Sequence, residues 1–274
     1  MNDTKMITFR DGQQVCRLGQ GTYAMGQRRK EEIAALRRGL ELGLNLIDTA
    51  EMYNTEDLVG EAVRGCRDRA FIVSKVLPDN ASYEGTKQAC EQSLKRLGTD
   101  YIDLYLLHWI GRYPFEETVR AFTELQREGK IRMWGMSNLD VAHMEEVLSL
   151  PEGRECATDQ VLYNLKERGV EYDLLPWCTE RHIPLMAYTP LGEGQLRDDH
   201  WLHKIADRHG ATTTQIMLAW LLRNPDVIAI PKAGSVAHVE ENARALDIEL
   251  TDEDLRDIDR AFPRPTRKVP LAGW

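Results

Sequence analysis

The sequence has no excess of positive charge and no long apolar run. Its 35 Lys and Arg are outnumbered by 44 Asp and Glu, which gives a formal net charge of −9, so nothing favours nucleic acid or an anionic membrane as a partner. No stretch approaches the roughly 18 apolar residues of a membrane helix. The opening MNDTKMITFRDG also lacks the apolar segment of a signal peptide. We therefore expect a cytoplasmic protein that acts on a small molecule, with a monomer favoured and the oligomeric state left open.

Metal-binding and linker signals are also missing. Five scattered cysteines include no C-x-x-C pair, so they do not predict a zinc or redox site. His200 and His203 share one face of a predicted helix, but no third ligand lies near them, and we expect no metal. No Pro-rich or Ser-rich linker divides the chain, so a single domain over residues 1–274 is the simplest expectation.

Short apolar strands alternate with amphipathic helical segments along most of the chain. The predicted strands are LGQGTY, LNLID, FIVSKV, DLYLLHW, IRMWGMSN, ATDQVLY, IPLMAYTP and VIAIPK. Near-continuous apolar strands are typical of a parallel sheet covered by helices, and eight repeats over about 250 residues indicate a (β/α)8 barrel. Before the barrel, the alternating segment MITFRDGQQVCRLG turns at Asp11-Gly12, which predicts a β-hairpin that acts as a lid.

A doubly wound sheet is the alternative fold. It would be favoured by a G-x-G-x-x-G fingerprint, which places a dinucleotide pyrophosphate at a helix N-terminus. LGQGTYAMG supplies Gly19, Gly21 and Gly26, but its last gap is four residues instead of two. The barrel is therefore the preferred prediction.

Polar side chains end several of the predicted strands. Asp48 ends the second strand with Tyr53 close behind, the third strand carries Lys75 after FIVS, and the fourth ends in His108 after LYLL. The carboxyl ends of the strands carry the chemistry in barrels of this type, so these residues belong on one face. Each also has an ordinary explanation, because Asp48 could begin a turn, Lys75 could reach solvent, His108 could be a core histidine and Tyr53 could pack as an aromatic.

Their joint occurrence favours a site. An isolated charge in an apolar strand costs several kcal/mol unless it is paired, and a pair of Asp48 with Lys75 removes that cost. A nearby ammonium also makes a phenol a better acid. Tyr53 would then be a general acid, with His108 hydrogen-bonded to a substrate carbonyl oxygen. This arrangement predicts carbonyl reduction.

Several motifs in order resemble one known family. DTAEMY, FIVSK, LYLLHW, GKIRMWGMSN and IPKAGS resemble the aldo-keto reductases over essentially the whole chain, most closely the small bacterial members of methylglyoxal-reductase type. The resemblance implies NAD(P)H-dependent reduction of small aldehydes or dicarbonyls to alcohols, with a catalytic tetrad of Asp48, Tyr53, Lys75 and His108. Tyr53 would be the proton donor.

The resemblance also implies the residues that bind NADPH. Ser137, Asn138 and Gln160 would bind the nicotinamide carboxamide, and Tyr188 would stack on the ring. Ser-Asn after a strand is also an ordinary helix start, which is the alternative interpretation of Ser137 and Asn138. Further cofactor contacts are implied for Gly21, Thr22, Leu191, Lys232, Ser235, His238, Glu241 and Asn242.

The segment IPKAGS predicts a phosphate site even without the family. Loops after the last two strands of a barrel often bind phosphate, and Lys232, Gly234 and Ser235 precede a predicted helix start. The resemblance makes this the adenosine 2′-phosphate site. The family's usual arginine falls at His238 here, and its first Ser or Thr is Ala233, which weakens the expected preference for NADPH and leaves NADH possible.

The substrate is less defined than the reaction. Short predicted loops indicate an open pocket, lined by Tyr23, Trp109 and the C-terminal Trp274. A Schiff-base aldolase that uses Lys75 is the rival enzyme, and a binding or regulatory protein on a reductase scaffold is the non-enzymatic alternative. The aldolase would leave Tyr53 and the phosphate site unexplained.

Overall fold

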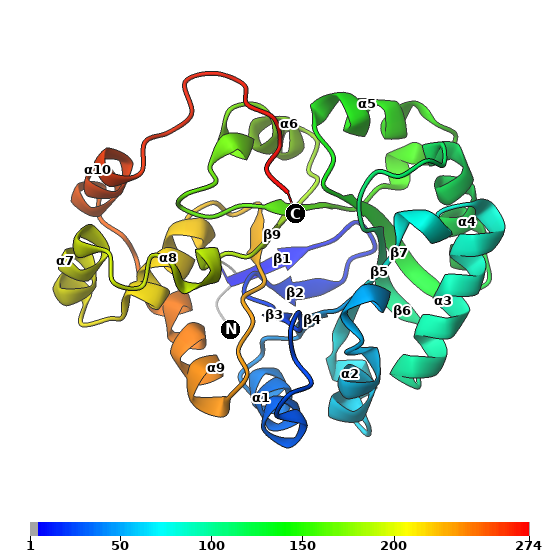
Figure 1. The fold of residues 1–274 in the computed structure, drawn as a ribbon, viewed down its shortest axis with the longest axis horizontal. Coiled ribbons are helices and arrows are strands. Elements are labelled where there is room, and N and C mark those ends of the chain that lie inside the picture. The colour runs from blue at the N-terminus through cyan, green and yellow to red at the C-terminus, as the bar shows by residue number, and fades with distance from the viewer. Residues whose placement is uncertain (1–4, 274) are drawn as a thin grey trace.

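Eight parallel strands form the centre of the computed structural model, which describes residues 5–273 (Figure 1). The strands lie side by side in chain order, from β3 to β10. Parallel bridges between Leu18 and Ala229 and between Gly21 and Lys232 join the first edge to the last. The predicted (β/α)8 barrel is confirmed, and the sequential order excludes the doubly wound alternative. The barrel strands are β3 (Gln20–Gly21), β4 (Leu46–Asp48), β5 (Phe71–Val76), β6 (Ile102–Leu107), β7 (Ile131–Ser137), β8 (Asp159–Leu162), β9 (Leu185–Tyr188) and β10 (Val227–Ala229).

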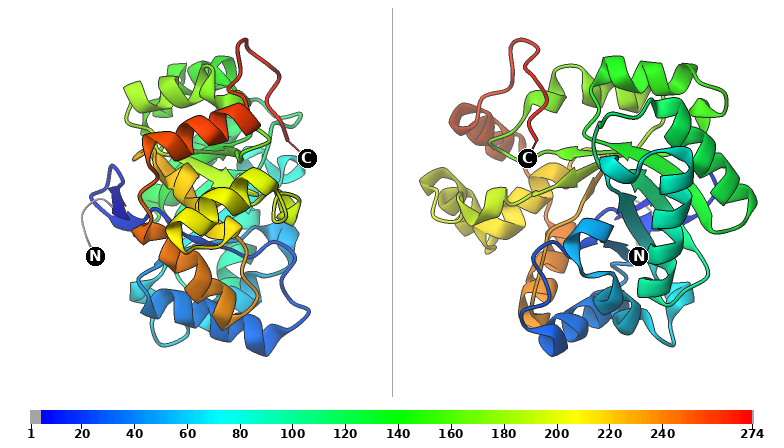
Figure 2. Two further views of the ribbon diagram at one scale, coloured as in Figure 1. Left: turned by 90° about the vertical axis from the view of Figure 1, so that its left-hand side faces the viewer. Right: turned by 45° about the vertical axis from the view of Figure 1, so that its right-hand side comes forward.

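Helices surround the strands on the outside (Figures 1 and 2). Several begin where a side chain accepts a hydrogen bond from the first turn, as Ser82 does for α3 and Thr212 does for α8. Helices α3 and α7 end at Gly98 and Gly210, whose φ angles of 64° and 58° are left-handed. The helices around the barrel are α1 (Arg29–Glu41), α2 (Glu56–Val63), α3 (Tyr83–Leu97), α4 (Phe115–Arg127), α5 (Val141–Ser149), α6 (Leu174–Glu180), α7 (His200–His209), α8 (Thr213–Leu222), α9 (Val236–Ala243) and α10 (Asp252–Ala261). Among residues 5–273, no helix is long and apolar enough to cross a membrane.

The predicted hairpin precedes the barrel. Strands β1 (Met6–Thr8) and β2 (Gln14–Cys16) pair in antiparallel fashion. Phe9 of the turn stacks on Phe71, the first residue of β5, with ring centroids 5.3 Å apart. The hairpin therefore covers the amino-terminal end of the barrel, and Figure 2 (left) shows it on the opposite side of the molecule from the C-terminal tail. The hairpin is therefore a lid on the end of the barrel opposite to the loops that follow the carboxyl ends of the strands.

Alternation along the strands separates an inner core from an outer one. Inward-facing side chains form one buried cluster that includes Leu46, Val73 and Leu106. Their neighbours Ile47, Ile72, Tyr105 and Leu107 belong to the cluster under the helices. Because side chains of a strand alternate between faces, the residue two positions beyond an inward apolar residue also faces the barrel interior.

Candidate active site

The alternation brings three of the predicted catalytic residues into the barrel. Asp48, Lys75 and His108 each follow an inward-facing residue of their own strand by two positions, at its carboxyl end. All three are buried. The fourth, Tyr53, ends the short 3-10 helix Glu51–Tyr53 that follows β4.

The four side chains lie within hydrogen-bond reach of one another. Lys75 Nζ donates to Asp48 Oδ2 at 2.7 Å and to the Thr49 carbonyl oxygen at 2.8 Å. The Tyr53 hydroxyl lies 3.5 Å from Lys75 Nζ and 3.5 Å from His108 Nε2. A phenol is thus placed between an ammonium and an imidazole at the mouth of the barrel.

The electrostatics of Tyr53 differ from the sequence-based expectation. We expected Lys75 to lower the pKa of Tyr53, but burial and the Asp48 carboxylate raise it above its ordinary value. Burial is the larger cause, because it disfavours the charged phenolate, while the ammonium of Lys75 is paired with Asp48. Burial lowers the pKa of Lys75, and Asp48 opposes that shift. Tyr53 is consequently held protonated, which is the form a proton donor needs.

His108 is held neutral. Burial, together with the charge of Lys75, lowers the pKa of His108 to about 2. Within residues 5–273, its buried Nδ1 has no hydrogen-bond partner. The imidazole can therefore offer one N–H to a substrate oxygen without carrying a positive charge.

A set of buried hydroxyls supports the tetrad. Thr22 was expected to contact the cofactor, whereas Thr49 and Thr55 were not predicted from the sequence. Thr22 Oγ1 donates to the Asp48 carbonyl oxygen at 2.9 Å, and the Thr55 hydroxyl lies 2.9 Å from those of both Thr22 and Thr49. The Thr22 side chain is thereby engaged within the protein. Position alone, at the end of the second barrel strand, is the signal that would have pointed to Thr49.

The predicted nicotinamide residues form one chain of hydrogen bonds. Tyr188 Oη donates to Asn138 Oδ1 at 2.8 Å, and Asn138 Nδ2 donates to Ser137 Oγ at 3.1 Å. Ser137 Oγ donates to the Gln160 carbonyl oxygen at 2.7 Å, and Gln160 Nε2 reaches Asp48 Oδ1 at 2.7 Å. The chain leads from the barrel rim to the tetrad. Its amides and hydroxyls fit a carboxamide ligand, which needs both donors and acceptors.

Ser137 and Asn138 do not begin a helix. Ser137 is the last residue of β7, and Asn138 has a left-handed φ of 62°. Helix α5 is capped instead by Asp140, whose side chain accepts from the His143 N–H at 3.0 Å. The alternative interpretation of this dipeptide as an ordinary helix start is therefore wrong.

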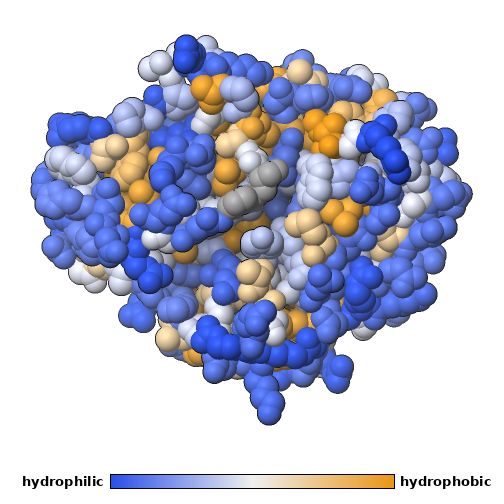
Figure 3. Space-filling model, viewed as in Figure 1, coloured by the Kyte–Doolittle hydropathy of each residue, from blue (hydrophilic) through white to orange (hydrophobic). Residues whose placement is uncertain are grey.

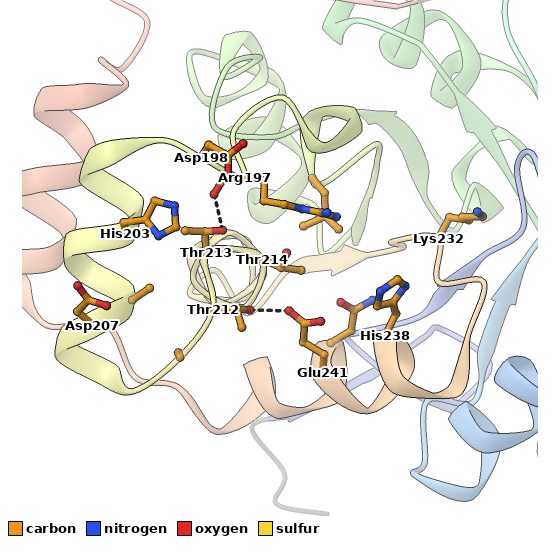
Figure 4. Close-up of a pocket in the computed structure, with 14 residues that line it drawn as sticks. Arg197, Asp198, His203, Asp207, Thr212, Thr213, Thr214, Lys232, His238 and Glu241 are labelled. Carbon is orange, nitrogen blue, oxygen red and sulfur yellow. Dashed lines mark hydrogen bonds between the residues drawn. The ribbon is translucent and has the colours of Figure 1, made fainter.

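A separate pocket contains residues predicted for the adenosine end of the cofactor. It encloses about 510 Å³ between α7, α8 and the loop before α9, and the tetrad does not line it. Figure 4 shows His238 directed into it from α9, Lys232 at one side, and a hydrogen bond from Thr212 to Glu241 of 2.7 Å. Arg197 also projects into it from the loop before α7. Of the predicted residues, the pocket is lined by Leu191, Lys232, His238, Glu241 and Asn242.

Two further predicted cofactor residues, Gly21 and Ser235, lie beside this pocket and beside the junction where the first barrel strand, β3, meets the segment after the last, β10. At this junction the Gly21 N–H donates to the Pro231 carbonyl oxygen at 3.0 Å. A Cβ at Gly21 would lie 2.7 Å from the Ile230 carbonyl oxygen, so only glycine permits this approach. Ser235 caps α9, where its Oγ accepts from the His238 N–H at 3.4 Å, which leaves its hydroxyl hydrogen free to donate.

Aromatic rings border the entrance to the tetrad. Tyr23 is 60% exposed and its ring lies edge-on to Tyr53 at 5.2 Å, while Trp109 is 37% exposed and 4.6 Å from the His108 ring. Figure 3 shows a hollow near the middle of this face with apolar side chains around it. Gly273 of the C-terminal tail also lies here, since a Cβ on it would be 3.7 Å from Asn138 Oδ1. Trp274, expected to line the pocket, lies outside the described residues.

Residues 17–262 match the sequence model of the aldo/keto reductase family. The chain is 51% identical to the methylglyoxal reductase YeaE of Escherichia coli over 97% of its own length and 98% of that protein. It is 35% identical to a glyoxal reductase of Bacillus subtilis, over 92% of this chain and 91% of that protein. A crystal structure of a Klebsiella pneumoniae aldo-keto reductase in complex with NADPH superposes with a TM-score of 0.95 at 49% identity, covering 98% and 99% of the two chains.

Proposed function

This chain belongs to the aldo/keto reductase family, and on that basis we propose that it reduces small aldehydes and dicarbonyls such as methylglyoxal with NADPH. It is an NADP-dependent oxidoreductase, as expected from the sequence. The substrate class is proposed from the methylglyoxal and glyoxal reductases among its relatives. The exposed rings of Tyr23 and Trp109 beside the tetrad support it, because they offer apolar contact to a short carbonyl compound.

The placement of the Tyr53 hydroxyl carries the proposal. It lies 3.5 Å from both Lys75 Nζ and His108 Nε2, so a carbonyl oxygen that entered this angle would meet an O–H and an N–H donor together. Two donors directed at one oxygen stabilise the negative charge that develops there during reduction.

Each residue of the tetrad then has a separate task. Bound NADPH would supply the hydride to the carbonyl carbon. Tyr53 gives its proton to the carbonyl oxygen, and the neutral His108 orients that oxygen through its N–H. Lys75 stabilises the phenolate that remains, and Asp48 fixes the ammonium through the 2.7 Å contact. Ser137, Asn138, Gln160 and Tyr188 would hold the nicotinamide end, while the pocket at Lys232 and His238 would hold the adenosine end.

The activity is tested by following NADPH absorbance with methylglyoxal as substrate. We expect turnover by the wild-type protein, and a loss of about 10²-fold or more in kcat for Tyr53→Phe, which keeps the ring and removes the proton. The dissociation constant for NADPH should change little. Near wild-type reduction by Tyr53→Phe would remove Tyr53 from the donor role.

The aldolase alternative is tested in the same preparation. Borohydride treatment in the presence of a carbonyl substrate traps a covalent adduct on a Schiff-base lysine. We expect no adduct on Lys75, because its ammonium is fully buried and bonded to Asp48 and Thr49. An adduct there without NADPH turnover would support the aldolase.

We further propose that the enzyme is a cytoplasmic monomer and that residues 1–274 form a single domain. The support for a single domain is that the family match spans residues 17–262 of this chain. Analytical ultracentrifugation would test the oligomeric state.

A further inference from the structure

Arg28 lies next to the loop that follows β10, although the two are more than 200 residues apart in the sequence. Arg28 is the residue immediately before α1. A Cβ built on Gly234 would lie 3.3 Å from Arg28 Nη2 and 3.4 Å from Lys232 Nζ. The guanidinium and the ammonium therefore flank the same point, directly over the backbone of Gly234.

The two cations have little negative charge to balance them. Arg28 uses Nη1 to contact Glu31 Oε2 at 3.0 Å, which leaves Nη2 directed at the loop. In the part of the chain that the structure describes, no carboxylate lies within ion-pair distance of Lys232. Two like charges at one point repel each other, and an anion bound between them reverses the sign of that interaction.

The backbone at this point also suits an anion. Gly234 presents no side chain, and Ser235 begins α9 with a hydroxyl whose hydrogen is free to donate. The first turn of a helix offers N–H groups and a favourable dipole to a phosphate. Helix α1, which begins directly after Arg28, packs against α9, and Arg38 Nε contacts Glu240 Oε1 at 2.8 Å between the two helices.

We infer that Arg28 is the second cation of the 2′-phosphate site, and that it supplies from the loop after β3 the guanidinium that is missing at His238. This inference rests on the proposed use of NADPH. A guanidinium can bind two phosphate oxygens at once, which an ammonium cannot do. Arg28 thereby selects NADPH over NADH, and the preference for NADPH is stronger than the residues of the IPKAGS segment alone predict.

Dissociation constants for NADPH and NADH, measured by quenching of tryptophan fluorescence, test the assignment. The Arg28 side chain is 55% exposed, so we expect a modest effect: Arg28→Ala should weaken NADPH by about tenfold and change NADH by less than about twofold. Arg28→Lys should fall between, since it keeps the charge and loses the fork. Calorimetry with 2′,5′-ADP and 5′-AMP should show the same contrast without the nicotinamide.

Two variants in the first turn of α1 complete the test, one as a matched control and one with the opposite expected effect. Arg29→Ala removes the same charge from the adjacent residue, but this guanidinium contacts Asp57 and Glu61 of α2 at 3.0 Å, so NADPH binding should stay within about twofold. Glu31→Gln removes the carboxylate that competes for Arg28, and NADPH should bind about two- to threefold tighter.

The outcomes separate this inference from the proposed function. If Arg28→Ala leaves NADPH affinity unchanged, or weakens NADH equally, Arg28 does not contact the 2′-phosphate even though the protein remains an NADPH enzyme. Equal losses in Arg28→Ala and Arg29→Ala would also overturn it, because they would indicate only long-range charge. Failure of the wild-type protein to bind NADPH would instead refute the proposed function.

Discussion

Asp159 should destabilise the protein increasingly as the pH rises, and Asp159→Asn should remove this effect. Asp159 is the first residue of β8 and its side chain is fully buried. It precedes Gln160, which is one of the residues predicted to bind the nicotinamide. Oδ1 lies 3.5 Å from the Leu139 N–H, and Oδ2 has no partner within residues 5–273. Burial, with a smaller effect from the charge of Asp140, raises the pKa of Asp159 from 3.8 to about 8.

The sign and size of the effect follow from proton linkage. Between the two pKa values the native protein keeps a proton that the unfolded chain releases, so each pH unit lowers the free energy of unfolding by about 1.4 kcal/mol. From pH 3.8 to 7 this amounts to about 4 kcal/mol. Asparagine reproduces the shape and the donor of the protonated carboxyl group but does not ionise.

Urea unfolding of both proteins, followed by circular dichroism from pH 5 to 9, measures this difference. The free energy of unfolding of Asp159→Asn minus that of wild type should rise by about 1.4 kcal/mol per pH unit to about pH 8 and then level off. Other ionisations cancel in the difference. Asp79→Asn, at an exposed position, controls for the loss of one carboxylate. A difference between Asp159→Asn and wild type that does not change from pH 5 to 9 would show that Asp159 is ionised in the native protein.

Two further predictions concern charge at the site. Lys75→Met should abolish most turnover and lower stability by about 3–5 kcal/mol, because it leaves the buried carboxylate of Asp48 without its cation. The double variant Asp48→Asn with Lys75→Met should regain stability in urea unfolding but not turnover, and a double variant with restored turnover would contradict the role of the ammonium. His238→Arg should lower the dissociation constant for NADPH by very roughly tenfold, and Lys232→Ala should raise it. Neither variant should change the dissociation constant for NADH much. Equal effects on the two cofactors would mean that this loop does not contact the 2′ position.

The sequence determined the barrel and the residues at its mouth through local patterns. Predicted apolar strands of five to eight residues, separated by helical segments, leave few architectures other than a closed parallel barrel. Asp48, Lys75 and His108 could be placed together because each ends such a strand, and the carboxyl ends of parallel strands meet at one rim. The hairpin was also predictable, since alternation and the Asp11-Gly12 turn are both local.

Contacts between distant segments were decided only by the tertiary structure. Arg28 is one of several cations in QRRK, and only closure of the barrel between β3 and β10 brings it to Gly234. The pKa of Tyr53 is raised by burial and by the charge of Asp48, and both depend on how the folded chain surrounds the phenol. Asp159 appears in the sequence as an ordinary acid in ATDQVLY, and its pKa is raised because the folded chain buries its side chain completely. A sequence pattern fixes the face on which a side chain lies, whereas charge interactions depend on separation and burial in three dimensions.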